Sequence, residues 1–180
     1  MKLGFNKVLL LTMLALLPVC NLSATNDRAS WAHTYCKEGN CKIAFPKEPE
    51  HMQQLMPVPE ENTHLQYDVY LSGLEGQAVF MMLVAEYPMK GMEAYTEVNL
   101  ENFLNGLLSQ NPNNKLIFAD ITDFNGHKAL DFFIRTKGVF FKGRAILANN
   151  HLYLIAMECE MQNYSEDRYN FFVNSFEFIN

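Results

Sequence analysis

The sequence predicts an α+β fold, in which an antiparallel β-sheet containing a four-strand meander is packed by two or more helices. Three observations lead to this fold class. Four segments of strand character follow one another in the second half of the chain. Two-residue turn sequences separate these segments. A segment of helical periodicity precedes them and another follows them.

The meander is the best-defined part of the prediction. Its strands are expected at residues 116–124, 127–136, 139–148 and 152–160. The turns between them are Asn125-Gly126, Lys137-Gly138 and Asn149-Asn150. Asn-Gly indicates a tight hairpin most strongly, because both central residues of such a turn take positive φ.

Earlier strands are predicted from alternation and from apolar runs. Residues 41–45 form a short strand that Pro46 stops. Residues 64–71 alternate apolar and polar side chains, which is typical of a half-buried strand. Residues 78–87 are almost entirely apolar and predict a central strand buried on both faces. Residues 46–62 contain four prolines and are expected to form a long irregular connection.

Two helices complete the expected fold. The first covers residues 94–110, and its apolar stripe consists of Val98, Phe103, Leu104, Leu107 and Leu108. The second begins at Ser165, which can cap it, with Glu166 and Asp167 in the favourable first turn. A short tail at residues 177–179 is expected to add an edge strand.

The N-terminus has the layout of a secretory signal peptide. Lys2 and Lys7 precede an apolar run at residues 8–19, which is shorter than the about 20 residues that a membrane-spanning helix needs. Small residues follow, and cleavage after Ala24 would place the mature N-terminus at Thr25. Lipid attachment at Cys20 is the competing hypothesis. The predicted location is extracytoplasmic, either periplasmic or secreted.

The domain organisation that follows is a signal peptide at residues 1–24, an N-terminal extension at 25–40 and a single domain at 41–180. About 156 residues remain after cleavage, which is a single-domain length. The formal net charge of −6 argues against nucleic acid as a partner. No membrane span is expected once the signal peptide is removed.

Three cysteines lie beyond the signal peptide. Cys36 and Cys41 are separated by four residues that include a Gly-Asn turn, so we predict a disulfide between them. Cys159 alternates with apolar residues and is expected to be a buried free thiol. A zinc site formed by His33 with Cys36 and Cys41 is the alternative.

Register arithmetic across the meander predicts one charged cluster. Two-residue turns place Asp131 opposite Arg144, and Asp120 opposite Asp131. We interpret this cluster as a structural ion network, with ligand recognition as the alternative. Catalysis by the paired carboxylates is disfavoured, because the arginine would keep both of them ionised. The same registers place an apolar set on the other face: Ile117, Ala119, Ile121, Leu130, Phe132, Ile134, Phe141, Ala145 and Leu147.

Other chemistry is weakly indicated. The chain has no phosphate-binding loop, dinucleotide fingerprint or nucleophile elbow, and no cofactor or metal is expected. The five histidines are scattered, with none paired at ligand spacing: His33, His51, His64, His127 and His151. Met81 and Met82 are expected to point to opposite buried faces of one strand, whereas Met89 and Met92 lie in a loop that could form a soft binding surface.

The layout resembles the PsbP-like family, whose fold is shared with a Ran-binding nuclear import factor. The resemblance rests on Phe45-Pro46 followed by Pro49, on Tyr87-Pro88, and on the aromatic segment at residues 171–178. It covers roughly residues 41–179. PsbP proteins are exported accessory subunits, so the resemblance implies a binding or assembly scaffold and carries over no catalytic residue.

The sequence therefore predicts a non-enzymatic exported accessory protein that binds another protein or an envelope component. A carrier for a small amphiphilic ligand is the alternative, and an enzyme of unknown type is the third hypothesis. An exposed apolar patch would favour the first, and a closed apolar pocket the second. A cleft with perturbed titratable groups would favour the third.

Overall fold

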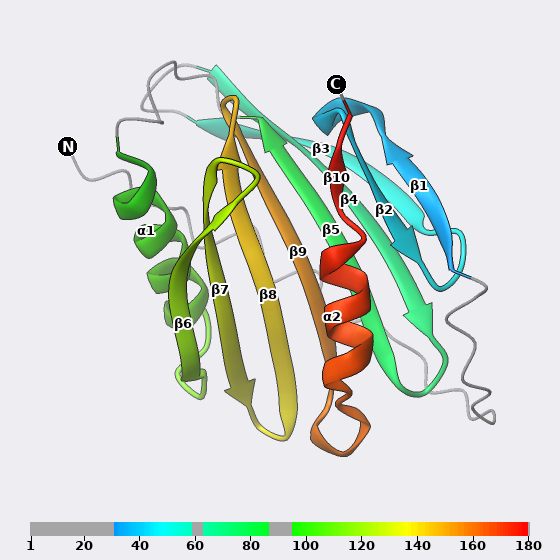
Figure 1. Ribbon diagram of the computed structural model, residues 1–180. Helices are drawn as coiled ribbons and strands as arrows, with labels where there is room; N and C mark the ends of the chain where they lie inside the picture. The colour runs from blue at the N-terminus through cyan, green and yellow to red at the C-terminus, as the bar shows by residue number, and fades with distance from the viewer. Residues whose placement is uncertain (1–30, 59–62, 87–94, 180) are drawn as a thin grey trace.

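The computed structural model describes residues 31–58, 63–86 and 95–179. These residues form a seven-stranded and a three-stranded antiparallel sheet with two α-helices (Figure 1). The large sheet has the order β3-β4-β5-β9-β8-β7-β6, and the small sheet the order β1-β2-β10.

The strands of the large sheet are β3 (Glu50–Val58), β4 (Thr63–Leu74), β5 (Ala78–Glu86), β6 (Lys115–Phe124), β7 (His127–Thr136), β8 (Val139–Ala148) and β9 (His151–Glu160). Those of the small sheet are β1 (Ala32–Cys36), β2 (Cys41–Phe45) and β10 (Glu177–Phe178). The helices are α1 (Thr96–Ser109) and α2 (Glu166–Asn174), with the short 3-10 turns η2 (Lys37–Gly39) and η5 (Met161–Asn163).

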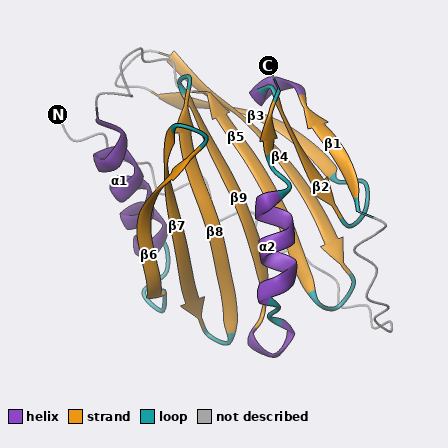
Figure 2. Ribbon diagram, in the orientation of Figure 1, coloured by secondary structure: helices purple, strands orange, loops and turns teal. Residues whose placement is uncertain are grey.

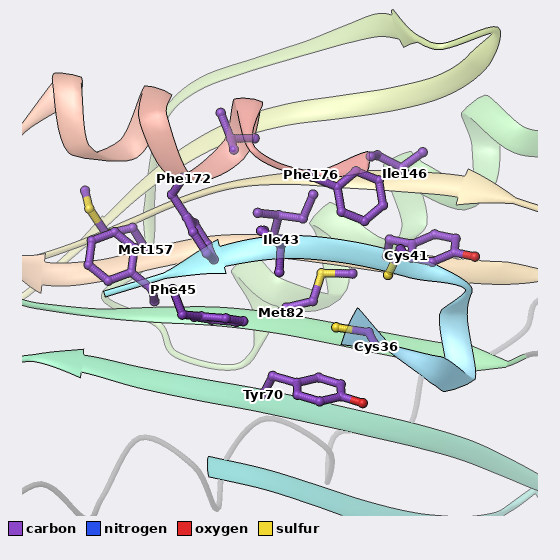
Figure 3. Close-up of a cluster of buried hydrophobic side chains, with 14 of the residues drawn as sticks. Cys36, Cys41, Ile43, Phe45, Tyr70, Met82, Ile146, Met157, Phe172 and Phe176 are labelled. Carbon is purple, nitrogen blue, oxygen red and sulfur yellow. The ribbon is translucent and has the colours of Figure 1, made fainter. Parts of the chain in front are cut away.

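The central strands of the large sheet are covered on both faces. Helix α1 covers one face, and α2 together with the small sheet covers the other (Figure 2). On the α1 side, Leu100, Phe103 and Leu107 pack on the sheet. On the other side, Ile43 and Phe45 of β2 meet Phe172 of α2 above Met82 and Met157 (Figure 3). This layering explains why β5 is buried on both faces, as its apolar sequence predicts.

The predicted α+β class and meander are confirmed. The four meander strands begin and end within one residue of the expected positions. The three turns that connect them all have positive φ at both central residues. The Ser165 side chain caps α2 by accepting a hydrogen bond from the backbone N–H of Arg168 at 3.4 Å. The tail pairs with β2 as an edge strand.

Two segments in which no strand was expected form strands. Residues 50–58, within the presumed connection, form β3, which pairs with β4 along its length. The prolines of this region led us to predict an irregular connection. However, β3 is an edge strand of the large sheet, where a proline, which has no backbone N–H to donate, is tolerated. Residues 32–36, within the presumed extension, form β1 and pair with β2. Residues 25–30 lie outside the described residues.

The apolar face of the meander also departs from the expectation at β6. Most of the set is buried against α1, but Ile117 and Ala119 are exposed. A bulge between Leu116 and Phe118 breaks the regular register there, and β6 is the edge strand. Val98, expected on the buried stripe of α1, is 53% exposed. No helix in the described part of the chain is both long and apolar enough to cross a bilayer.

Candidate functional site

The charged cluster predicted from register is present between β7 and β8. Asp131 lies directly opposite Arg144, as predicted. The guanidinium donates twice to the carboxylate, from Nε to Oδ1 at 2.7 Å and from Nη2 to Oδ2 at 2.8 Å. A bidentate pair of this kind fixes the orientation of both side chains.

This ion pair lies on the face that α2 covers. The Arg144 guanidinium is 5.5 Å from the centre of the Phe124 ring, and about a fifth of each charged side chain is exposed (19% for Arg144 and 22% for Asp131). The hydrogen bonds to Asp131 raise the pKa of Arg144. Asp120 lies opposite Asp131 on the exposed strand β6, and no ion pair joins Asp120 to another described residue. The geometry fits a structural ion pair better than a three-residue recognition site.

A second cluster, which the sequence analysis missed, lies where the small sheet meets β3 and β4. Glu38 comes from η2, His51 from β3 and Asp68 from β4. Each offers one ligand-type atom, and these atoms all lie within 4.8 Å of one another. Carboxylate oxygens and an imidazole nitrogen at this spacing form a potential cation site.

Asp68 and His51 form the inner part of this cluster. Asp68 is 1% exposed, and its Oδ1 lies 2.9 Å from Nε2 of His51. The side-chain amide of Gln66 donates to Oδ2 of Asp68 at 3.5 Å. His51 keeps 40% of its side chain exposed, so the cluster runs from a buried carboxylate to the surface.

Tyr70 orients both of the outer groups. Its hydroxyl donates to Oε2 of Glu38 at 2.7 Å, and this hydrogen bond lowers the pKa of Glu38. Burial, followed by the hydrogen bond to Glu38, raises the pKa of Tyr70. The Tyr70 ring stacks on His51 with a centroid distance of 4.3 Å and an interplanar angle of 10°. Glu38 and His51 are thereby held beside each other.

The position of Glu38 depends on the close approach of Gly39 to the large sheet. The Tyr153 hydroxyl donates to the carbonyl oxygen of Gly39 at 2.9 Å. A Cβ at Gly39 would lie 2.9 Å from Cε1 of Tyr153 and 3.0 Å from Val84. Only glycine lets the hairpin turn rest directly on the sheet, and this contact places Glu38 over Tyr70.

Sequence reasoning missed this cluster because no local pattern marks it. Glu38 belonged to the presumed extension, and His51 to the presumed irregular connection. Asp68 was assigned to the polar face of a half-buried strand, but the small sheet covers that face and buries it. The sequence offered one signal. Gln66, Asp68 and Tyr70 are alternate residues of one strand, so the face that carries the Asp68 carboxylate also carries a large aromatic residue, which is unusual for an exposed face.

Cys36 and Cys41 lie directly opposite each other at the end of the β1–β2 hairpin, and both are fully buried. Both are free thiols in the structure, so the disulfide stays a prediction. The hydrogen bond with the Cys36 thiol, followed by burial, raises the pKa of Cys41. The alternative zinc site of His33 with Cys36 and Cys41 is wrong. His33 is exposed, and because it lies an odd number of residues from Cys36 along β1, the two side chains point to opposite faces of the strand.

The remaining sulfur-containing residues behave mainly as packing residues. Cys159 is buried, as predicted, at 5% exposure, and burial raises its pKa to about 11. That this thiol stays reduced in the exported protein remains a prediction. Met82 belongs to the core under the small sheet, whereas Met81 packs against the core under α1. The predicted soft surface at Met89 and Met92 lies outside the described residues.

The outer strand β6 carries an exposed apolar segment. Leu116, Ile117 and Phe118 are consecutive and are 45%, 50% and 49% exposed. Within the described ranges, β7 is the only strand that pairs with β6, so its other edge is unpaired. Such an edge is an available surface for another molecule.

Comparison with solved structures identifies the fold. The solution structure of cyanobacterial PsbP (CyanoP) from Synechocystis sp. PCC 6803 matches with a TM-score of 0.59 at 12% sequence identity, over 90% of this chain and 98% of that chain. The chain therefore has a PsbP-like fold, as the sequence resemblance predicts.

The other comparisons add little. A crystal structure of PA94, a protein of unknown function from Pseudomonas aeruginosa, matches over 74% of this chain and 85% of that chain at 12% identity. Its TM-score of 0.34 is too low to support an inference. No protein-family model matches the sequence, and no curated protein matches it.

Proposed function

We propose that this chain is an exported, non-enzymatic accessory protein that binds another protein or an envelope component. The observation that carries the proposal is the exposed apolar segment on β6. Three consecutive large apolar residues at an unpaired sheet edge are an aggregation hazard unless a partner covers them.

The shape of this edge favours contact through side chains. Successive residues of a strand point to opposite faces, so the segment presents apolar groups on both sides of the edge. The bulge between Leu116 and Phe118 interrupts the ladder and turns the strand locally. A partner that contacts the side chains on both faces of this edge fits the arrangement better than a partner that only adds a strand to the sheet.

Two further features support the proposal. The fold is similar to that of CyanoP, and the PsbP-like family that the sequence resembles consists of exported accessory subunits. The first 24 residues have the layout of a signal peptide, which would deliver the protein to the periplasm or the exterior. Cleavage after Ala24 is expected to leave Thr25 at the mature N-terminus, and a lipid on Cys20 would overturn that assignment.

The carrier hypothesis receives less support. A pocket between α1 and the sheet would suit an amphiphilic ligand. That space is occupied by side chains of α1, which pack directly on the sheet: Leu100, Phe103, Leu104 and Leu107. The protein-binding hypothesis is therefore the better one.

The test is cross-linking in the native envelope with a tagged full-length chain, comparing Ile117→Lys with Leu55→Lys. Leu55 is 65% exposed on the opposite edge strand β3, so the control introduces the same charge at an edge of the same sheet. We expect a specific cross-linked protein to disappear in Ile117→Lys and to persist in Leu55→Lys. Equal cross-linking in the two variants, both folded by circular dichroism, would exclude the β6 edge as the binding surface.

A further inference from the structure

The geometry points to a binding site for a divalent transition-metal ion formed by Glu38, His51 and Asp68, with zinc as the best-fitting ion. This inference is independent of the proposed function, because the cluster lies at β3 and β4 and the apolar segment lies on β6 at the opposite edge of the sheet.

The donor set is the first argument. One imidazole nitrogen and two carboxylate oxygens suit zinc, which is commonly held by three protein ligands with water at an open position. The nitrogen donor makes calcium and magnesium poor candidates, because both prefer oxygen ligands. Manganese accepts the same donors but binds more weakly in the usual affinity order.

The spacing is the second argument. His51 Nε2 and Asp68 Oδ1 are 2.9 Å apart, and all three ligand-type atoms lie within 4.8 Å of one another. Zinc bonds of about 2.0–2.2 Å place tetrahedral ligand atoms roughly 3.3–3.6 Å apart. Small rotations of Glu38 and His51, which are both exposed, would bring the atoms to that spacing.

The surrounding contacts are the third argument. Tyr70 donates to one oxygen of Glu38 and stacks on the His51 ring, which orients both groups. Gln66 donates to the Asp68 oxygen that does not contact His51. Metal sites use such outer contacts to hold their ligands in place. Tyr70 and Gln66 would play that part here.

Charge is the fourth argument. The cluster brings two carboxylates together, and Asp68 is almost completely buried. Within the described ranges, the one basic side chain in ion-pair contact with Asp68 is His51. A divalent cation would neutralise both carboxylates, which a single imidazolium does only partly.

The experiment is a zinc titration of the purified full chain, previously stripped with EDTA, in competition with a chromogenic zinc indicator. The variants are Glu38→Gln, His51→Gln and Asp68→Asn, and the control is His33→Gln, which removes an exposed histidine from the neighbouring strand β1. We expect one zinc ion per chain, an affinity at least about tenfold weaker in the cluster variants, and no change in the control.

A second measurement guards against loss of folding, because Asp68→Asn alters a buried group. Glu38→Gln and His51→Gln change exposed side chains, and circular dichroism reports whether they fold. In the unaltered protein, zinc should shift the imidazole NMR resonances of His51 and leave those of exposed His64 unchanged. Absence of zinc binding would overturn the inference. Unchanged zinc affinity in Glu38→Gln and His51→Gln, both shown to be folded, would also overturn it. So would a larger loss of zinc affinity in the control His33→Gln than in these variants.

Discussion

At the scale of single residues, the charged groups of this protein fall into two kinds of environment. Arg144 and Asp131 form a bidentate pair that is largely shielded from water. Lys128, by contrast, reaches Glu97 at 3.4 Å and Asp123 at 3.5 Å with 41% of its side chain exposed. Shielded pairs are costly to break, whereas exposed pairs contribute little to stability.

Arg144→Ala should therefore lower the free energy of unfolding by roughly 1–3 kcal/mol, because it leaves the Asp131 carboxylate shielded and without its partner. Lys128→Ala, the matched control, should change it by less than about 0.5 kcal/mol. Urea denaturation measures both values. If Arg144→Ala leaves stability unchanged but abolishes partner binding, the structural interpretation is wrong and this face is a recognition site.

Cys36 and Cys41 lie opposite each other across the β1–β2 hairpin, so the exported protein should contain the Cys36–Cys41 disulfide and a reduced Cys159. Closing this short loop should add roughly 2 kcal/mol to the free energy of unfolding. Peptide mapping by mass spectrometry under non-reducing conditions checks the pairing. A disulfide that involves Cys159 would contradict both parts of the prediction, because Cys159 is buried on β9.

Glu158 should make stability depend on pH. Burial raises its pKa, so the folded protein holds this proton more tightly than the unfolded chain does. The charged form then destabilises the fold at neutral pH, and stability recovers as the pH falls through the folded-state pKa. Glu158→Gln should raise the free energy of unfolding at pH 7 by roughly 0.5–1 kcal/mol.

This gain should shrink as the pH falls, and it should vanish below about pH 4, where the wild-type carboxyl is protonated in both states. The control is Glu160→Gln, which changes an exposed residue on the same strand. Chemical denaturation at several pH values provides the comparison. A gain in Glu158→Gln that persists at low pH would show that burial of charge is not its cause.

At the scale of the elements, the meander turns set the register of the strands. Gly126 has a φ of +83° in the β6–β7 turn, and a Cβ there would meet nothing within 4 Å. The requirement for glycine at this position is therefore one of backbone conformation alone. Gly73 also has open space around it but lacks a positive φ, which makes it a matched control.

Gly126→Ala should lower the free energy of unfolding by roughly 1–2 kcal/mol, because an L-residue is strained in the left-handed region. Gly73→Ala should have an effect close to zero or slightly stabilising, since alanine restricts the unfolded chain. Thermal denaturation monitored by circular dichroism distinguishes the two variants. Equal effects would mean that turn conformation does not limit the stability of the meander.

At the scale of the whole molecule, the backbone of the small sheet's hairpin turn at Gly39 contacts side chains of the large sheet directly. The Tyr153 hydroxyl holds the Gly39 carbonyl, and a side chain at Gly39 would collide with Tyr153 and Val84. The packing of the two sheets creates both the core beneath β2 and the Glu38–His51–Asp68 cluster.

Gly39→Ala should lower the free energy of unfolding by roughly 1–3 kcal/mol, because the added methyl group overpacks this contact. The penalty should be smaller in a Val84→Ala background, where part of the obstructing side chain is removed. A double-mutant cycle by urea denaturation measures the coupling. If the effects of Gly39→Ala and Val84→Ala on the free energy of unfolding are strictly additive, the turn is not in tight contact with Val84.

Local sequence patterns suffice to predict the α+β class, the meander with its three turns, the cap of α2 and the Asp131–Arg144 register. These features depend on neighbours in the chain: positive φ at Asn125-Gly126, the alternation of apolar residues, and a cap three residues from its partner. The buried apolar run of β5 is predictable for the same reason, because burial on both faces leaves no room for polar residues.

Local patterns do not predict which surfaces the small sheet covers or which sheet edges stay unpaired, because both depend on contacts between distant segments. The proline-containing segment becomes strand β3 because β4 is available to pair with it, and Asp68 is buried because the β1–β2 hairpin folds over it. Glu38, His51 and Asp68 meet only through these long-range contacts, and β6 stays exposed because it ends the sheet. Contacts between distant segments leave no periodic signal in the sequence, so local patterns cannot predict them.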